Sequence, residues 1–332
     1  MDFLFDLMKS RIFFFLGVIS LLILSVDTAN AQMPPCLTSE CDFCMCSQGI
    51  SPLEMGGSAI RYDVRYTELS REYSNGARVA NSTNMFESYF TNQLSFIYHI
   101  ADAVTASLIV PYAHKNESFV NPINSPFAIS NTGPVDISLL ARYNLIAEHS
   151  FGNTRIFSLT GGVKFANGST SLTDQGQPAD PDVQLGTGTT DFFAGAGYLL
   201  GFENWSLGAD LLGGIRGFGG GASGHVYGDN LNYDVTARYR IYQTEVNRPS
   251  IFSPTVFAAL GIRGEWRGYE LQDGVRIDNS GGDVTYIAPG IQIFFTPTIS
   301  LDATVWVPFI HALNGDQLGE TVKILSGAQI VF

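Results

Sequence analysis

Charged residues and long hydrophobic runs are both scarce in this chain. Lys, Arg, Asp and Glu make up 15% of its 332 residues, below the roughly 25% of a typical soluble domain. After residue 30 there is no run of about 18 apolar residues, which excludes a membrane-spanning helix from that part. Yet 45% of the residues are hydrophobic and the mean hydropathy is +0.12. A closed β-barrel is the other way in which an apolar chain spans a membrane, and a soluble all-β protein is the alternative.

Recognisable catalytic motifs are also missing. No G-x-S-x-G occurs, and the glycine-rich stretch Gly186–Asp191 lacks the Lys of a phosphate-binding loop and precedes a strand. The five His residues are scattered over loops and strand ends, so a Ser-His or Asp-His pair would have to be assembled from loops. We therefore expect no enzymatic activity, no cofactor and no nucleic-acid partner.

Residues 1–31 have the pattern of a cleaved signal peptide. Lys9 and Arg11 precede the apolar stretch Ile12–Val26, and Ala29-Asn30-Ala31 fits the small-residue cleavage rule. An N-terminal anchor helix is the alternative, although this apolar stretch is short for one. Export fits the formal net charge of −13, because barrels of this type carry acidic loops to the outside.

Residues 32–57 form a separate segment that contains every cysteine of the chain, and we expect it in the periplasm. The spacing C-x4-C-x2-C-x-C suits two disulfides in an oxidising compartment, with three possible connectivities. Four thiolates holding a soft metal are a second possibility, and free thiols a third. No His follows to make a haem attachment site. The cysteines are Cys36, Cys41, Cys44 and Cys46.

From residue 58 the pattern becomes repetitive, and 58–332 is predicted to be a transmembrane antiparallel β-barrel of about twelve strands. Short turns at 100–103, 201–204 and 296–298, with somewhat longer ones near 147–154 and 244–253, alternate with long polar segments. Such one-sided loop lengths are typical of outer-membrane barrels. The long segments are 72–85, 115–134, 166–190, 218–232, 269–283 and 310–321. The strands are expected at 58–71, 86–99, 104–114, 135–146, 155–165, 191–200, 205–217, 233–243, 254–268, 284–295, 299–309 and 322–332.

Alternation along these strands gives an apolar face and a polar face. The last strand, Val322–Phe332, has this pattern and ends on Phe332, as the closing strand of an outer-membrane barrel does. Aromatic residues at strand ends, such as Tyr98 and Tyr143, fit the aromatic girdles of the membrane interfaces. Pro289, inside a strand, predicts a bulge because it cannot donate to the ladder.

The polar face carries most ionisable groups of the strands, and we interpret it as the lining of the lumen. Either water fills this lumen as a solute path, or ion pairs cross it and fill the barrel. The acidic residues of the long segments, Glu117, Asp182 and Glu320 among them, are interpreted as solvated, with divalent-cation binding near lipopolysaccharide as the alternative. The expected pore-lining residues are Arg61, Arg65, Arg142, Lys164, Arg216, Arg238, Arg240, Arg263, Lys323, Asp63, Asp136, Asp210, Asp234, Glu265 and Asp302.

Two stretches carry a family resemblance. Leu185–Asp191, read as L-G-T-G-T-T-D before a strand with Gly195 and Gly197, resembles the G-x-G-x-x-D segment of transporters assigned to the MetA pathway of phenol degradation. Thr296-Pro297 and Leu313–Gly319, read as L-N-G-D-Q-L-G before the final strand, are similar to that family as well. The resemblance covers about 135–332 and implies an outer-membrane barrel related to FadL-type transporters of hydrophobic compounds.

These observations together predict an outer-membrane channel for passive uptake of small solutes, and the resemblance adds aromatic or hydrophobic compounds as candidates. A basic-lumen porin for small organic anions and a structural barrel with a closed lumen are the alternatives. Its partners would be outer-membrane lipid and lipopolysaccharide, the barrel-assembly machinery and a small-molecule solute.

Overall fold

The computed structural model describes residues 57–120, 126–150, 153–174, 176–244 and 254–332. The predicted signal peptide and all four cysteines lie outside these residues. No helix in the described part of the chain is long and apolar enough to cross a membrane.

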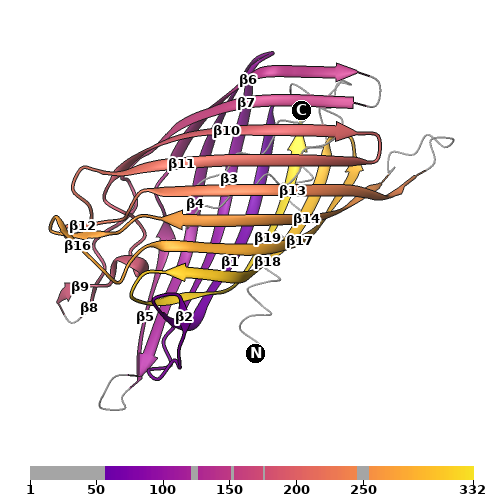
Figure 1. Ribbon diagram of the computed structural model, residues 1–332. Coiled ribbons are helices and arrows are strands. Elements are labelled where there is room, and N and C mark those ends of the chain that lie inside the picture. Colours follow the sequence, from indigo (N-terminus) through magenta and orange to yellow (C-terminus); the bar gives the residue numbers. More distant parts are fainter. Residues whose placement is uncertain (1–56, 121–125, 151–152, 175, 245–253) are drawn as a thin grey trace, which may run out of the picture.

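Twelve antiparallel strands form the wall of a closed barrel, each paired with its neighbours in chain order (Figure 1). The predicted all-β barrel and its strand number are confirmed. The wall strands are β1 (Ala59–Ser74), β3 (Phe86–Ala101), β4 (Val104–Val120), β6 (Ser138–Ser150), β7 (Asn153–Lys164), β10 (Thr190–Phe202), β11 (Trp205–Phe218), β13 (Asn230–Gln243), β14 (Thr255–Arg267), β17 (Gly282–Thr296), β18 (Ile299–Leu313) and β19 (Asp316–Val331).

The barrel closes where β19 pairs with β1, in register from Ala59 opposite Val331. At the terminus the backbone N–H of Ser58 donates to the Phe332 carbonyl at 3.1 Å, and the Phe332 N–H donates to the Ser58 carbonyl at 2.8 Å. The terminal aromatic residue therefore completes the seam, and no edge of the wall is left unpaired there.

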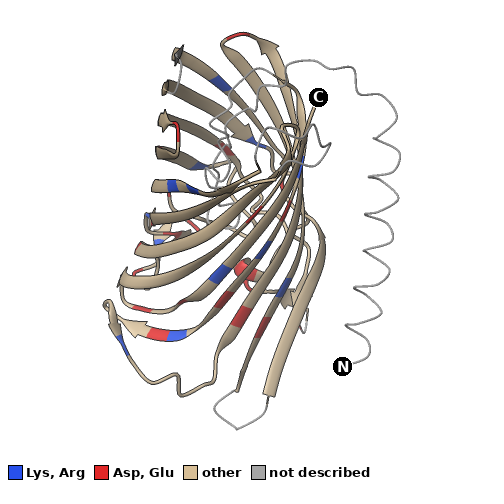
Figure 2. Ribbon diagram, turned by 90° about the vertical axis from the view of Figure 1, so that its right-hand side faces the viewer, with Lys and Arg blue, Asp and Glu red and all other residues tan. Residues whose placement is uncertain are grey.

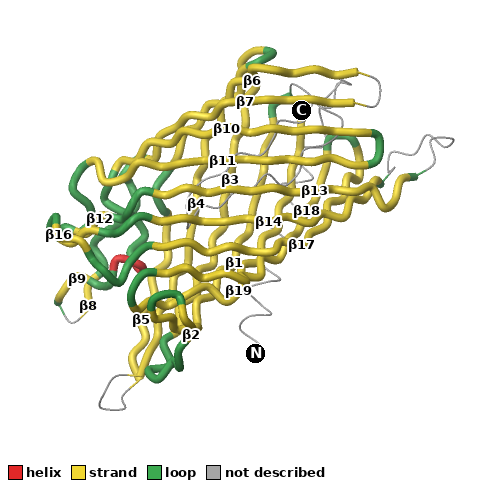
Figure 3. The backbone as a smooth tube through the Cα atoms, viewed as in Figure 1, coloured by secondary structure: helices red, strands yellow, loops and turns green. Residues whose placement is uncertain are grey.

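The connections differ at the two ends of the barrel, as expected. At one end, here called the turn end, β3–β4, β10–β11 and β17–β18 are joined by two-residue turns. The other, the loop end, carries longer segments with small strands of their own (Figure 3). These elements are β2 (Ala77–Arg78), β5 (Pro126–Pro134), β8 (Thr173–Asp174), β9 (Gln177–Pro178), the 3-10 turn η1 (Pro181–Val183), β12 (His225–Val226), β15 (Leu271–Gln272) and β16 (Val275–Arg276).

Three of the predicted connecting segments lie largely in strands instead. The segment 310–321 is no long loop, because β18 runs to Leu313 and β19 starts at Asp316. The segment 115–134 belongs largely to β4 and β5, which pair from Tyr112–Pro134 to Val120–Pro126 and extend the wall beyond its rim. The segment 147–154 falls mostly within β6 and β7. Ladder hydrogen bonds to neighbouring strands keep polar sequences in β structure, which sequence polarity alone does not reveal.

Pro289 makes no bulge. It stays in register opposite Leu260 of β14, and the two register shifts of β17 against β18 lie elsewhere, at Thr285/Tyr286 and Phe294/Thr296. The pairs assigned between β17 and β18 pass from Ile287 directly to Gly290, with the same register on both sides. The missing N–H of a proline therefore interrupts this ladder without shifting it.

Side chains alternate between an exposed apolar outer face and a buried inner face. On β18, for example, Leu301, Val305 and Val307 are exposed, whereas Asp302, Thr304 and Trp306 are buried. Exposed large apolar side chains occur on every wall strand except β1, and exposed aromatic residues such as Tyr98, Trp205 and Phe332 lie near strand ends. Such an outer surface suits the hydrocarbon of a bilayer and its interfaces. Figure 2 shows residues of both charges interleaved along the strands.

Candidate functional site: a polar cavity at the loop end

The segment between β7 and β10 folds inward at the loop end. Leu185 is 5% exposed and packs against Ala113 of β4 and Val135, both on the inner side of the wall. Asn131 of β5 donates its side-chain N–H to the carbonyl of Val183 in η1 at 3.1 Å. Burial of apolar side chains thus places η1 and its acidic residues inside the mouth of the barrel.

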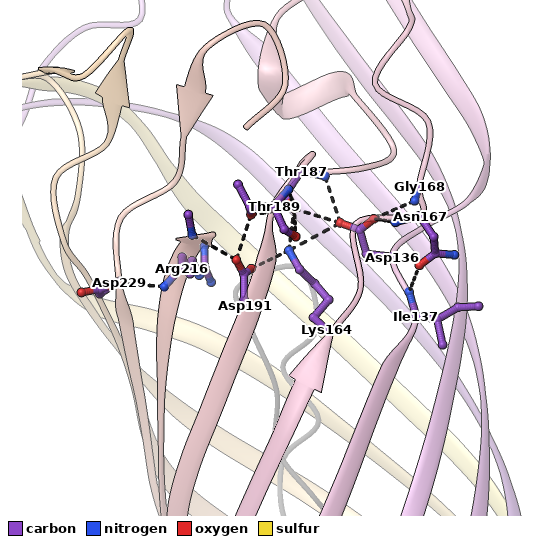
Figure 4. A network of polar contacts seen from close by, with 11 residues as sticks. Asp136, Ile137, Lys164, Asn167, Gly168, Thr187, Thr189, Asp191, Arg216 and Asp229 are labelled. Carbon is purple, nitrogen blue, oxygen red and sulfur yellow. Dashed lines mark hydrogen bonds and ion pairs between the residues drawn. The ribbon is translucent and has the colours of Figure 1, made fainter. Parts of the chain in front are cut away.

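Asp136 anchors this segment to the wall (Figure 4). Its carboxylate accepts backbone N–H groups from Asn167 at 3.0 Å, Gly168 at 2.7 Å and Thr187 at 2.9 Å, as well as the Thr187 hydroxyl. Lys164 Nζ lies 3.4 Å from the same carboxylate and 2.6 Å from Asp191. Asp136 and Lys164 are fully buried, so this network is charge-paired and hydrogen-bonded rather than solvated.

The sequence stretch that carried the family resemblance, Leu185–Asp191, supplies half of this network. The Thr189 hydroxyl donates to Asp191 at 2.8 Å, and Lys164 Nζ donates to the Thr187 hydroxyl at 2.6 Å. Its glycines permit close backbone crossings. A Cβ at Gly186 would lie 2.2 Å from the Gly168 carbonyl oxygen, and Gly188 has φ +71° with a Cβ position 2.6 Å from the Ala222 nitrogen. The motif therefore holds its own segment, between β7 and β10, against Asp136 and against the segment between β11 and β13.

A cavity of about 290 Å³ opens between this inward segment and the opposite wall. Its walls come from β1, β3, β4, β11, β14, β19 and five of the loop-end segments. Seven acidic and four basic residues line it, so its lining carries a formal excess of negative charge. The acidic residues are Glu87, Asp136, Asp180, Asp182, Glu270, Asp316 and Glu320, and the basic ones are Lys115, Arg216, Arg267 and Lys323.

The acidic side chains concentrate around η1. Asp180 caps η1 by accepting the Asp182 N–H at 2.9 Å, and the Tyr227 hydroxyl donates to the Asp182 carboxylate at 3.3 Å. Enclosure by the barrel mouth raises the pKa of Asp182 well above its ordinary value, and the carboxylates of Glu87, Asp180 and Glu270 raise it further, whereas Lys115 lowers it. Asp182 therefore keeps its proton up to a higher pH than an ordinary aspartate does.

Deeper in the barrel, ion pairs connect the inner faces of the strands. Lys323 Nζ lies 2.6 Å from Glu265, and Arg263 Nε lies 2.8 Å from Asp234. Nearer the turn end, Arg61 contacts Asp302 at 2.8 Å and also donates to Asp63. The structure thus brings most of the sequence-predicted residues together as pairs, which differs from a continuous basic wall.

The remaining predicted residues lie at different depths. Arg142 and Asp210 meet at Gly197, where an added Cβ would lie 2.8 Å from Arg142 Nη2 and 2.5 Å from Asp210 Oδ1. Arg65 is buried two residues from Asp63, and Arg238 is buried beside a small cavity of about 10 Å³. Arg216 lines the mouth cavity.

Arg240 is half-buried near the turn end, where its guanidinium donates to the Asn204 side-chain oxygen. Arg238, Arg240 and Arg263 therefore do not form one continuous basic surface, because Arg263 is paired with Asp234 and Arg240 contacts the turn that contains Asn204.

Sequence reasoning missed several residues of the mouth. Glu117, interpreted as a solvated loop residue, is 6% exposed on β4, and Glu320 is 3% exposed on β19. Glu87 and Lys115 were not singled out from the sequence, although both are buried. The signal was available for Glu87 and Lys115, because the alternation of β3 and β4, continued to the loop end, turns both inward.

Within the described residues, no group of three or more His, Cys, Asp or Glu side chains converges closely enough to hold a metal ion. The possible thiolate site of the four cysteines lies outside those residues and stays a prediction.

Among solved structures, the barrel is similar to the COG4313 outer membrane channel from Pseudomonas putida F1. The TM-score is 0.63 at 15% identity, covering 93% of this chain and 100% of that one. The transport unit of the autotransporter AIDA-I from Escherichia coli has TM-score 0.42, 14% identity and coverages of 83% and 90%. A FadL homologue from Pseudomonas aeruginosa has TM-score 0.38, 11% identity and coverages of 82% and 90%. Only the first of these scores bears on the fold. No family model and no curated protein matches the chain.

The closed wall, its apolar outer surface and this likeness of fold establish a bacterial outer-membrane β-barrel, as the sequence indicated.

Proposed function

We propose that this barrel is a passive channel for small polar solutes, which enter through the cavity at the loop end. The observation that carries the proposal is a row of charged side chains on the inner face, which runs past apolar clusters such as that of Val284, Tyr286 and Trp306. Lys323 lines the mouth cavity and also pairs with Glu265, a buried residue of β14. Arg263 and Asp302 continue this lining at the small cavity beside Arg238. A row of charges on the inner face and an apolar outer face are what a water-filled path across a bilayer needs.

The lining favours a polar solute among those that the sequence left open. Aromatic or hydrophobic compounds would have to pass a mouth whose walls are mainly polar and include eleven charged residues, and desolvating those groups without replacement contacts is costly. A porin for small organic anions is disfavoured by the excess of carboxylates in the mouth. A structural barrel with a closed lumen is the remaining alternative, and the buried ion pairs favour it to the extent that they fill the interior.

Single-channel recording of the purified full-length protein in planar bilayers tests the proposal. We expect discrete current steps that increase when Trp306→Ala removes a bulky side chain from the lumen, because Trp306 is 1% exposed on the inner face. Trp266→Ala is the matched control, since Trp266 is exposed on the outer face of β14. If the unaltered protein and Trp306→Ala both fold and neither conducts, the channel proposal is wrong and the closed structural barrel remains as the alternative.

The expected contacts with lipopolysaccharide and with the barrel-assembly machinery stay predictions that follow from an outer-membrane location.

A further inference from the structure

One carboxylate in the mouth cavity is incompletely satisfied. Glu320 lies in the cavity wall, is 3% exposed and accepts Arg267 Nη2 on its Oε1 at 2.8 Å. Lys323 Nζ is 4.0 Å from the same oxygen and donates instead to Glu265 at 2.6 Å. Glu320 Oε2 has no hydrogen-bond donor among the described residues. A buried carboxylate oxygen without a donor is rare and calls for a cation, a water or a ligand group to complete it.

The acidic residues around η1 also favour a positively charged ligand. Asp180 and Asp182 are exposed to the cavity, and Glu87 lies opposite on β3 as a buried neighbour. The charge of Lys115 acts on this group by lowering the pKa of Asp182, and Lys115 Nζ lies 5.5 Å from the centre of the Tyr89 ring. A pocket lined by excess charge of one sign and walled by protein focuses the field and concentrates the opposite ion.

The size and lining of the cavity decide which kind of cation fits. The carboxylates do not converge as a metal site within the described residues, so a bare divalent ion would find no compact set of ligands. A volume of about 290 Å³ instead accommodates a small organic molecule. Tyr89 and Tyr227 add aromatic rings to the lining, and such rings attract ammonium groups through their electron-rich faces.

We propose that the mouth cavity binds small organic ammonium ions, with the carboxylates of Asp180, Asp182 and Glu320 supplying the counter-charge. This inference rests on the proposed channel function and gives that channel its solute class. Binding at the mouth would raise the local concentration of such ions at the entrance and favour them over anions of the same size.

Isothermal titration of the detergent-solubilised full-length protein with choline at low salt tests this inference. We expect choline to bind the unaltered protein and sodium benzoate not to bind. Asp180→Asn combined with Asp182→Asn should weaken choline binding by about tenfold or more, because two counter-charges are lost while Asn keeps the cap of η1. Asp174→Asn combined with Asp278→Asn is the matched control, which removes two loop charges outside the cavity and should change affinity by less than about twofold.

Glu320→Gln is the second variant and should weaken choline binding even if the η1 variant does not fold. Choline that fails to bind, or that binds all variants equally, overturns the inference. The two proposals fail separately. If the protein conducts but does not bind choline, the proposed solute class is wrong and the channel stands. If it binds choline but does not conduct, the channel is wrong and the binding site stands.

Discussion

Lys323 on β19 and Glu265 on β14 form an ion pair with Nζ and Oε2 2.6 Å apart, although β17 and β18 separate these strands in the wall. Both side chains are 1% exposed. The pair therefore links two non-neighbouring strands across part of the barrel interior. The rings of Tyr286 and Trp306, on the two strands between, lie 5.0 and 5.9 Å from Lys323 Nζ. Contacts of this kind tie together wall strands that share no ladder.

Removing one partner of this pair should destabilise the barrel. Lys323→Met or Glu265→Gln leaves the other group in the interior without its partner, which costs about 3–5 kcal/mol for a buried pair. The double variant should lose less than the sum of the two, because no uncompensated charge remains. Urea unfolding followed by tryptophan fluorescence measures these differences. Losses below about 1 kcal/mol in both single variants would mean that water solvates the two groups in the lumen.

The alternation of side chains along a strand predicts that both residues of this pair face inward, but it does not predict that they contact each other. Alternation places Lys323, Glu265, Arg263 and Asp302 on the inner face, and the structure buries all four. The sequence did not predict which residues pair, because Lys323 contacts Glu265 on β14, which lies two strands beyond the direct neighbour β18. The pairing depends on how the barrel curves, which the sequence of one strand does not state.

Strand ends were predicted least well, for a physical reason. Glu117 and Glu320 stand in polar stretches that look like loops, yet ladder hydrogen bonds extend β4 and β19 through them. The dipeptide Asn314-Gly315 was a usable signal, since Asn-Gly between two apolar runs is typical of a tight hairpin. Gly315 has φ +56° in the turn between β18 and β19.

Asp136 should control the order of the inward segment between β7 and β10. Asp136→Ala removes three backbone hydrogen bonds to a charged acceptor, each worth about 1.5–3 kcal/mol. We expect hydrogen exchange at Asn167, Gly168 and Thr187 to accelerate by at least about a hundredfold. Asp136→Asn keeps one acceptor oxygen, so its exchange rates should lie between those of the unaltered protein and those of Asp136→Ala. Asp278→Ala, on an exposed side chain, is the control and should leave these amides unchanged.

The orientation of the barrel gives a prediction for intact cells. Epitope tags within 218–232 or 269–283, at the loop end, should be detected by antibody without permeabilisation, because long loops of outer-membrane barrels face outward. Tags at Asp102 or Asn204, in turns at the other end, should be detected only after permeabilisation. Surface detection of these turns would reverse the orientation and move the mouth cavity to the periplasmic side.

The four cysteines precede the first wall strand, so the barrel should not need them. Replacing Cys36, Cys41, Cys44 and Cys46 by Ser should leave a folded barrel that keeps its heat-dependent mobility shift on electrophoresis. Mass measurement without reductant should show the unaltered protein lighter by four hydrogens if two disulfides form. Bound zinc, copper or iron with intact thiolates would support the metal alternative instead.

Choline binding should weaken as the pH falls, and Asp182 should account for part of that change. Enclosure and neighbouring carboxylates raise the pKa of Asp182, so this group takes up its proton at a higher pH than an ordinary aspartate does. Below its raised pKa Asp182 is neutral and supplies no counter-charge, whereas above it the charge is present and binding is strongest. The linked stability has the opposite sign. A folded-state pKa above the unfolded value favours the folded protein at low pH, and that contribution is lost as the pH rises from the unfolded pKa through the folded one.

Titrations of choline at a series of pH values, with the unaltered protein and with Asp182→Asn, measure the effect. The variant should bind more weakly at high pH and show a smaller change with pH, because one titrating group has been removed. Some dependence should persist, since other charged groups face Asp182 from the surrounding elements. Those groups are Glu87 on β3, Lys115 on β4, Asp180 beside η1 and Glu270 of the segment between β14 and β17. The Tyr227 hydroxyl also donates to Asp182. Identical pH profiles for the two proteins would show that Asp182 carries the same charge throughout the range and would assign the dependence to the wall carboxylates instead.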